Sequence, residues 1–477
     1  MVVSLYLLLH AIIRLIFTDT LQVDDREQLF YAQSFEMGYD MPQPPLYSWI
    51  AFVFFKIFNV GLISLTIQKY LIIFITFCYI WLSSNLIFKN QKVRNIVFFS
   101  YLLMPSFMWH MHQGFTHTVL LGLGIAMSFY YFICLLKSPK FLYFFMLGLS
   151  FSIGFMGKYS FLIFLFLLIT SVLISKNLRY AFLDRRFLIT LTTFLIFIFP
   201  HSYWLSEHFN QIFVMASDRL NISSNDIISN KLLTLNELIF NIIGFVTPLI
   251  FVLFLSLKKG FLSSEKNKLI DRLDFRFLRN FHILILVFSF VFVLFANIGE
   301  VKVRWLHPLM MLFPFWIACE VNNKFKSNVF NLRRFSLFLI AFTILVLVVR
   351  VIQFSVAPSL GFYGRVNIPI TDSIDKIPKK TIDQISSIKT NDYFLGNHLH
   401  SLFRDKEIVI TGKYFNLDKR DIFKDCLWIW DNDGYDDLDI NSYSQIKFKE
   451  VQKITKSIEN KPYILSYAIE DKSFCHN

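Results

Sequence analysis

The sequence predicts an all-α polytopic membrane protein of about eleven transmembrane helices, followed by a small α/β domain outside the membrane. Three observations predict this class. The 477 residues are 55% hydrophobic and only 17% charged, which is too little polar surface for a soluble chain of this length. Apolar runs return many times at close to the roughly 20 residues that span a bilayer. After about residue 354 short alternating runs replace them.

The charge pattern predicts which loops face the cytoplasm. The net charge is +13, but the Lys and Arg residues stand in short clusters between apolar runs and form no single basic domain. This argues against nucleic acid as a partner and is typical of cytoplasmic loops. The clusters fall at 89–94, 137–140, 176–186, 258–279 and 324–334.

Placing these clusters inside fixes the crossings. The apolar start has no small-residue cleavage site after it and is interpreted as a retained first span. The expected spans are 1–18, 66–88, 95–112, 115–136, 141–157, 159–175, 187–204, 236–257, 280–297, 305–321 and 335–354. Eleven crossings place the N-terminus inside and the tail outside. Membrane lipids are the expected partners of the apolar helix surfaces.

The first outer loop is acidic. The stretch 19–45 carries six acids and one Arg, which suits the face opposite the basic loops. The apolar run 46–60 is short and contains Lys56, and counting it as a crossing would invert every later loop. We therefore expect 46–60 to be a helix lying at the outer membrane interface. The resulting domains are a transmembrane domain at 1–354, with the acidic loop 19–45 and the interfacial helix 46–60, and an α/β domain outside the membrane at 355–477.

The tail contains strand-like runs such as EIVITGKYF, CLWIW and PYILSYAI, which predict an α/β domain. Its acidic run at 431–439 places Gly fourth, so the EF-hand spacing fails and a solvated turn is the preferred interpretation. Cys426 and Cys475 could pair in an oxidising compartment or remain free. Cys78, Cys134 and Cys319 fall inside apolar spans and are expected to be packing residues.

Ionisable side chains gather at the outer ends of the expected spans. Lys158, Lys302 and Arg304 contradict the positive-inside bias there, and charged groups at membrane depth are functional candidates. The competing interpretation for Lys158 and Arg304 is snorkelling to lipid headgroups. The other members of the group are Asp24, Asp25, Glu27, His110, His112, His117, Tyr159, His201, Glu207, His208, Glu300 and His307. The histidines lack zinc-binding spacing and are expected to be polar interfacial residues, so no metal site is assigned.

Carboxylates and cations at one membrane surface suit glycosyl transfer from a lipid phosphate. Cations hold and neutralise the phosphate, and a carboxylate takes the proton of the attacking hydroxyl. No phosphate-binding loop of the GxxxxGK type occurs, so nothing indicates a soluble nucleotide donor.

The motif order resembles a known family. The segments VDDREQLFYAQSFEMGY and QPPLYSWI, then FTHTVLL, GKYS, PHSYWLSEH and RWLHPL, resemble GT-C glycosyltransferases in the branch of protein O-mannosyltransferases and the lipid A aminoarabinose transferase. The resemblance covers roughly residues 1–370. It implies a polytopic enzyme that uses polyprenyl-phosphate sugars at the outer face.

The resemblance also implies roles for single residues. Asp24 matches the acid that serves as catalytic base. Asp25, Glu27, His117 and Glu207 are supporting or acceptor-binding candidates, whereas Lys158, Tyr159, Arg304 and His307 fall where relatives face the lipid phosphate. The chain departs from the family at Asp25, where many relatives have Glu, and at His117, where some have a second acid.

The sequence therefore predicts an inverting glycosyltransferase of the bacterial inner membrane, with its active site on the periplasmic side. The donor is a polyprenyl-phosphate-linked sugar and the acceptor a lipid, glycan or protein. A divalent cation, Mg or Mn, is a possible cofactor. The alternative is a transporter or flippase of lipid-linked sugars, which would show repeated halves and midplane charges. A third interpretation, an anchored scaffold, needs far fewer spans.

Overall fold

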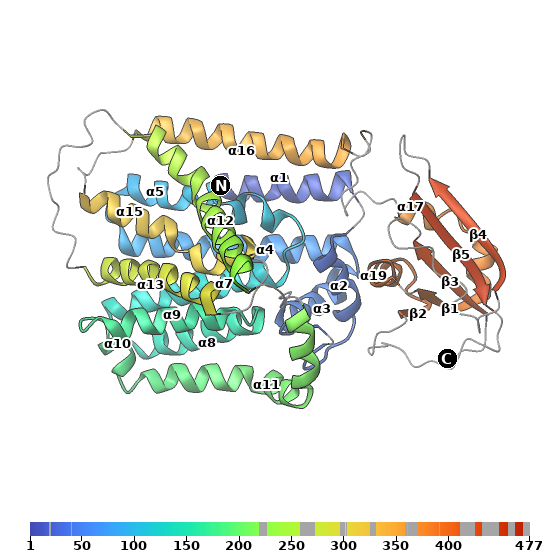
Figure 1. Ribbon diagram of the computed structural model, residues 1–477, viewed down its shortest axis with the longest axis horizontal. Coiled ribbons are helices and arrows are strands. Elements are labelled where there is room, and N and C mark those ends of the chain that lie inside the picture. Colours follow the sequence, from blue (N-terminus) through green and yellow to red (C-terminus); the bar gives the residue numbers. More distant parts are fainter. Residues whose placement is uncertain are drawn as a thin grey trace. The chain divides into compact units, whose positions relative to one another are not determined.

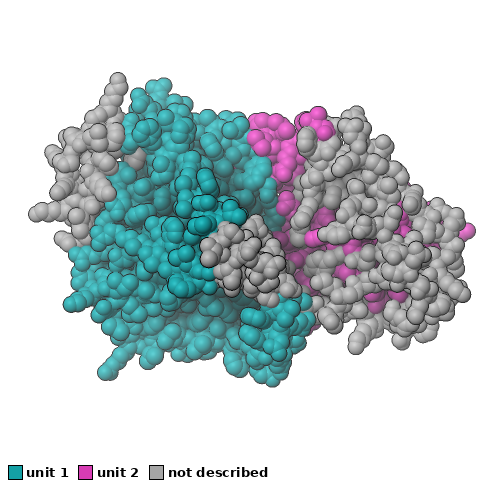
Figure 2. All heavy atoms as spheres, viewed as in Figure 1, with its two compact units in different colours: residues 1–4, 37–47, 69–346 teal, residues 5–36, 48–68, 347–477 magenta. Residues whose placement is uncertain are grey.

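The computed structural model describes residues 1–18, 21–39, 41–218, 227–257, 272–295, 301, 303–324, 331–357, 360, 370–390, 392–410, 425–431, 448–456 and 463–470. Most of the described residues are helical, and a single sheet lies near the C-terminus (Figure 1). The chain forms two compact units (Figure 2). Unit 1 comprises residues 1–4, 37–47 and 69–346, and unit 2 comprises 5–36, 48–68 and 347–477. The predicted division into domains at residue 354 concerns position relative to a membrane and stays a prediction.

Six helices are long and apolar enough to cross a membrane, counted over the described ranges. They are α4 (Leu62–Ile87), α7 (His117–Lys137), α11 (Phe187–Asp218), α12 (Ile227–Leu255), α13 (Leu273–Phe295) and α16 (Leu332–Ser355). Shorter apolar helices are α1 (Val2–Phe17), α8 (Phe141–Gly157) and α9 (Phe161–Ile174). Each of these nine coincides with an expected span, which confirms a multi-pass membrane protein.

The stretch 95–112 is not the single helix that we expected. It consists of α5 (Gln91–Ser100), a 3-10 turn (η1, Tyr101–Leu103), α6 (Pro105–Met108) and a second 3-10 turn (η2, His110–His112). Pro105 starts α6, and Met104 before it is extended at φ −82° and ψ 128°. Proline disfavours helical geometry in the preceding residue and lacks the N–H that continues a helix. The prediction of one continuous helix here was wrong.

The expected span 305–321 is divided for a related reason. It comprises α14 (Val303–Met310) and α15 (Phe313–Lys324), with a turn at residues 311 and 312. Pro308 lies inside α14 and Pro314 lies in the first turn of α15. A short α10 (Tyr180–Leu183) connects α9 to α11.

Close backbone contact joins the central helices of unit 1. α8 packs against both α7 and α11, and a side chain on Gly124 of α7 would come within 2.3 Å of the Cα atom of Gly154 on α8. Small residues permit such an approach between membrane helices. This pair therefore fixes α7 and α8 together beneath the turn that begins at Lys158.

The segment between the first two apolar helices, α1 and α3 (Leu46–Phe58), contains a helix that we did not predict. α2 (Val23–Tyr31) spans the acidic segment, and α3 matches the helix expected at 46–60. Asp24 and Asp25 lie in the first turn of α2, where negative charge stabilises the helix dipole. Leu29 and Ala32 pack with Ala51 and other apolar residues in a small core. The polar segment is therefore a packed helix.

The tail is an α/β domain, as predicted. Its mixed five-stranded sheet has the order β2-β1-β3-β5-β4. The strands are β1 (Ile385–Thr390), β2 (Glu407–Ile410), β3 (Asp425–Asp431), β4 (Phe448–Lys456) and β5 (Tyr463–Glu470). β1 pairs in parallel with β2 and β3, whereas β5 pairs antiparallel with β3 and β4. Strand order and direction therefore classify the domain as α/β.

Three helices accompany this sheet: α17 (Ile370–Ile374), α18 (Lys379–Gln384) and α19 (Tyr393–Leu402). Alternation along β3 divides its side chains, because Leu427 and Ile429 enter the core shared with α17 and α19, while Trp428 and Trp430 pack with Ala468 in a separate cluster. This period of two is typical of a strand that is covered on both faces.

Two predictions about the tail reach beyond the described residues. Cys426 is buried and disulfide-bonded, whereas Cys475 lies outside the described part of the chain, as do residues 432–439 of the acidic run. The pairing of Cys426 with Cys475 stays a prediction. Cys78, Cys134 and Cys319 are free.

Candidate active site

The three acids of α2 differ in their access to water. The side chains of Asp25 and Glu27 are buried, at 3% and 7% exposed, whereas Asp24 is half-buried. Buried carboxylates are held by partners within the protein. Asp24 is therefore the acid of this helix that an outside molecule can reach most readily.

Hydrogen bonds from neighbouring segments hold α2 in place. The Arg26 Nε–H donates to the Leu21 carbonyl oxygen at 2.6 Å, just before the helix begins. The Ser48 hydroxyl donates to the Gln28 Oε1 at 2.7 Å and joins α2 to α3. Both contacts are buried, where hydrogen bonds are strongest and least exchangeable with water. They fix the orientation of the helix that carries Asp24.

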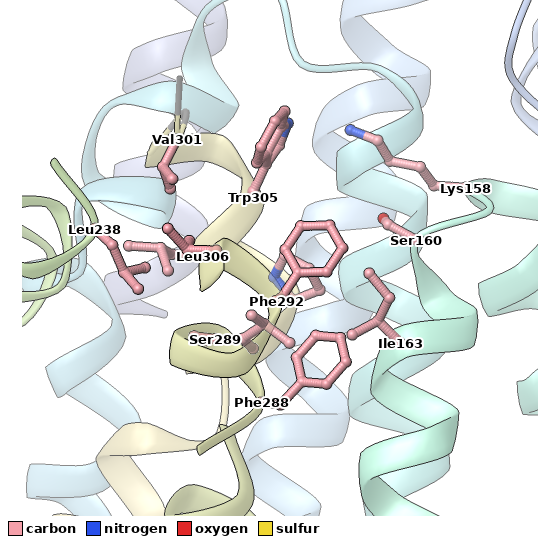
Figure 3. A pocket seen from close by; sticks show the side chains of 13 residues that line it. Lys158, Ser160, Ile163, Leu238, Phe288, Ser289, Phe292, Val301, Trp305 and Leu306 are labelled. Atoms are coloured by element: carbon pink, nitrogen blue, oxygen red, sulfur yellow. The ribbon is translucent and has the colours of Figure 1, made fainter. Parts of the chain in front are cut away.

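Lys158 ends α8 in the turn before α9. Its Nζ donates to the Thr118 hydroxyl of α7 at 2.8 Å, and its side chain lines a cavity of about 230 Å³ in unit 1. Lys158 and Trp305 lie near one end of this cavity, with Phe288 and Ile163 near the other (Figure 3). A cation therefore stands at one end of an apolar chamber.

The cavity is built from helices that are far apart in the sequence. Polar residues in its wall are Lys158, Ser160 and Ser289, and apolar side chains from α9, α12, α13 and α14 make up most of the rest. Such a lining suits a hydrocarbon chain, and the ammonium group suits an anion at its head.

A hydrogen-bonded chain links the turn after α8 to the start of the segment 37–47. His201 of α11 contacts the Met37 carbonyl oxygen through Nδ1 and the Tyr159 hydroxyl through Nε2, each at 2.8 Å. A carbonyl only accepts, so Nδ1 carries the proton, and Nε2 of the neutral ring accepts from Tyr159. Tyr159 thus connects the turn after α8 to the segment 37–47 through His201, and its expected role at a lipid phosphate stays a prediction.

Trp204 holds the same segment by packing. A side chain on Gly38 would come within 2.1 Å of the Trp204 ring, so only glycine permits this approach. The Trp204 ring stacks between His201 and His208, with centroid distances of 5.8 and 4.3 Å and interplanar angles of 18° and 10°. One face of α11 therefore clamps the chain just after Glu36.

The remaining expected residues have varied surroundings. His117 is buried, with Nδ1 3.3 Å from the Gly157 carbonyl oxygen and its ring 5.7 Å from that of Tyr47. Glu207 is exposed on α11. His307 is fully buried, 5.6 Å from the Phe107 ring, and does not line the cavity. Arg304 lies in α14 but its side chain is outside the described part, as are Glu300 and Lys302.

Two other histidines have structural partners. His112 contacts the Phe107 carbonyl oxygen at 2.9 Å and the Tyr70 hydroxyl at 3.2 Å, and His110 stacks on Phe115. Within the described ranges no three His, Cys, Asp or Glu side chains are grouped as metal ligands. The described residues thus form no recognisable binding site for the possible Mg or Mn ion.

Sequence reasoning missed several of these neighbours. It did not predict the Thr118 partner of Lys158 or the contact of Gly38 with Trp204. One signal was present, because His201, Trp204 and His208 recur at helical spacing in PHSYWLSEH and so share one face of α11.

These features define the class: a multi-pass membrane protein with a short acidic helix after its first apolar helix, a lysine-ended apolar cavity and an α/β tail. Residues 42–204 match the family model for dolichyl-phosphate-mannose-protein mannosyltransferase. Over these residues the chain is similar to that family of membrane glycosyltransferases.

Relatives of known name cover most of the chain. The lipopolysaccharide core galacturonosyltransferase RgtB of Rhizobium johnstonii is 26% identical over 83% of this chain and 79% of its own. RgtA, of the same description and organism, is 22% identical over 86% and 81%. The crystal structure of ArnT from Cupriavidus metallidurans bound to undecaprenyl phosphate superimposes with a TM-score of 0.63 at 10% identity, covering 97% of both chains. The fold is thus that of ArnT.

Proposed function

We propose that the protein is an inverting glycosyltransferase of the bacterial inner membrane, taking a sugar from a polyprenyl-phosphate carrier at the periplasmic face. The observation that carries this proposal is the cavity of about 230 Å³, apolar along its walls and bordered by Lys158. A polyprenyl phosphate has the matching chemistry, with an apolar chain and an anionic head. The bound undecaprenyl phosphate of ArnT supports the same donor class.

In the proposed reaction an acceptor hydroxyl attacks the anomeric carbon of the lipid-linked sugar. The new glycosidic bond forms as the bond from that carbon to the phosphate oxygen breaks, and the polyprenyl phosphate leaves with its negative charge. Asp24 takes the hydroxyl proton, a contribution of about 10²- to 10⁴-fold for a general base. Lys158, together with Arg304, neutralises the departing phosphate.

The supporting residues have narrower roles. Asp25 and Glu27, being buried, stabilise α2, whereas the exposed Glu207 is available to bind the acceptor. His117 and His307 are packed inside unit 1 and stabilise the helices α7 and α14, which carry Thr118 and Trp305. Tyr159 positions the segment 37–47 through His201.

The relatives narrow the substrates to be tried first. Both are named for galacturonosyl transfer to the lipopolysaccharide core. We therefore propose a uronic acid as the sugar and a lipopolysaccharide core glycan as the acceptor. The positive-inside pattern of the loops supports a periplasmic first loop and tail.

The test uses the purified full-length protein in lipid nanodiscs. With polyprenyl-phosphate-linked galacturonic acid and a lipopolysaccharide core acceptor, we expect release of polyprenyl phosphate and a glycosidic bond of inverted anomeric configuration, measured by mass spectrometry and NMR. Transfer from a nucleotide sugar without the lipid donor, or retention of configuration, would contradict the proposal.

A further inference from the structure

The two sides of helix α19 contact different parts of unit 2. Leu395 and Leu399 enter the core of the tail domain. A side chain on Gly396 would come within 2.5 Å of Ile410 on β2, so this side of α19 lies directly on the sheet. At about 100° per residue these positions occupy one side of the helix. The opposite side is free to contact something other than its own domain.

That opposite side contacts the first-loop helices, within unit 2. The His400 ring lies 4.8 Å from the ring of Phe30, and Phe394 lies 5.9 Å from the guanidinium carbon of Arg26. Just beyond the helix, an Arg404 N–H donates to the Val60 carbonyl oxygen at 2.6 Å. Two contacts from this face therefore reach α2, and a third, from just beyond α19, reaches the chain that follows α3.

Asn397 stands at the centre of this face and is 0% exposed. His400 beside it is also buried, and burial lowers its pKa to about 4. Polar side chains buried away from their own domain's core indicate that another element covers them. Figure 1 shows α19 between the sheet and α2, and the two helices pack together.

The helix α2 depends on this cover. It has nine residues, which is too short for a helix to be stable alone in water. Leu29 and Ala32 pack toward α3, while Arg26 and Phe30, one turn apart on α2, contact α19. The helix α2, which carries Asp24, is therefore packed between α3 on one side and α19 of the tail domain on the other.

We propose that the tail domain acts on the reaction through a docking surface that positions α2. The surface consists of Phe394, Asn397 and His400 of α19, with Arg404 just beyond the helix. These are positioning residues, since none is placed at the substrate. The inference rests on the proposed function for its catalytic consequence, but the docking itself is testable without any activity.

The test compares full-length variants by hydrogen exchange and by transfer kinetics. Asn397→Asp keeps the shape of the side chain and adds a charge that is expensive to bury, and His400→Ala removes the ring that contacts Phe30. We expect amide exchange in residues 23–31 to rise at least tenfold in both, with β1, β3 and α7 unchanged. We also expect kcat to fall at least tenfold at an unchanged donor KM.

The controls separate positioning from damage. His400→Phe keeps a ring against Phe30 and is expected to retain near wild-type exchange and kcat, and Leu402→Ala truncates an exposed residue of the same helix and is expected to do the same. If residues 23–31 exchange as slowly in Asn397→Asp and His400→Ala as in the wild type, the docking surface is refuted. Exchange that rises equally in β1 and β3 would also refute it, because the tail would simply have unfolded. A wild type without transfer activity would overturn the proposed function but leave the exchange result decisive.

Discussion

At the scale of residues, burial distinguishes groups that the sequence shows side by side. Asp25 and Glu27 flank Arg26 and are buried with it, while Asp24 remains half-buried. Lys158 likewise differs from the snorkelling lysines of a membrane surface, because its amine donates to Thr118 inside unit 1 and borders the cavity. Among these charged side chains, Asp24 and Lys158 are therefore the ones that we expect a substrate to reach.

Removing the charge of Lys158 should weaken donor binding. A hydrogen bond to a charged group is worth about 1.5–3 kcal/mol, so Lys158→Met should raise the dissociation constant of polyprenyl phosphate at least about tenfold. Lys158→Arg retains the charge and should lose less. Binding is measured in nanodiscs by isothermal titration calorimetry, and equal dissociation constants for Lys158→Met and the wild type would refute the assignment.

His400 should make the stability of the protein depend on pH. Burial lowers its folded-state pKa to about 4 from an ordinary value of 6.5, so between these pH values the unfolded chain binds a proton that the folded chain does not. Stability then falls as pH drops from 6.5 toward 4. His400→Phe should be less sensitive, so its unfolding temperature should rise relative to the wild type on going from pH 7.5 to pH 5. Parallel curves would contradict this expectation.

At the scale of elements, the packing of Trp204 against the segment 37–47 can be tested by comparing alanine substitutions at two glycines. Gly38→Ala would drive a methyl group into the Trp204 ring and should destabilise the protein by about 1–3 kcal/mol. Gly244 in α12 has open space around it, and Gly244→Ala should be neutral or slightly stabilising because alanine favours helix. Thermal unfolding in detergent checks both, and equal unfolding temperatures for the two variants would refute the clamp.

The sequence predicted most elements but not all, for identifiable reasons. Long apolar runs such as 117–137 are predicted to be membrane-spanning helices from their length and hydropathy. The helix α2 was missed because its residues are polar, although acids in its first turn were a signal. The break within 95–112 was missed because Pro105 stands in an apolar run and hydropathy ignores backbone geometry. Element type thus follows from composition, while interruptions require the dihedral preferences of single residues.

The site was predictable only in part. Lys158 stood out because it contradicts the positive-inside bias. The cavity beside it could not be predicted, since its walls come from residues between Lys158 and Leu309 on separate helices. The hydrogen bond of Tyr159 to His201 could not be predicted for the same reason, because the two residues are 42 positions apart.

At the scale of the whole molecule, the tail belongs with the first-loop helices. Residues 347–477 share a compact unit with 5–36 and 48–68, so the α/β domain is part of the framework around α2. This grouping gives a structural role to a domain that carries no expected site residue.

The membrane topology can be tested with single cysteines at exposed positions. Lys379→Cys on α18 should react with an impermeant maleimide in intact spheroplasts, because the tail is expected in the periplasm. Lys140→Cys, in a basic loop before α8, should react only after permeabilisation; both side chains are exposed. Labelling is compared with the wild type, which already contains free Cys78, and the reverse pattern would invert the proposed orientation.

The central claim is that Asp24 is the base of a polyprenyl-phosphate-dependent transfer, and one substitution tests it most directly. Asp24→Asn keeps the size of the side chain and removes its basicity, so kcat should fall by about 10²-fold or more with the unfolding temperature and donor binding unchanged. Asp383→Asn, at an exposed position of α18, is the matched control and should transfer at the wild-type rate. Near wild-type transfer by Asp24→Asn would contradict the account.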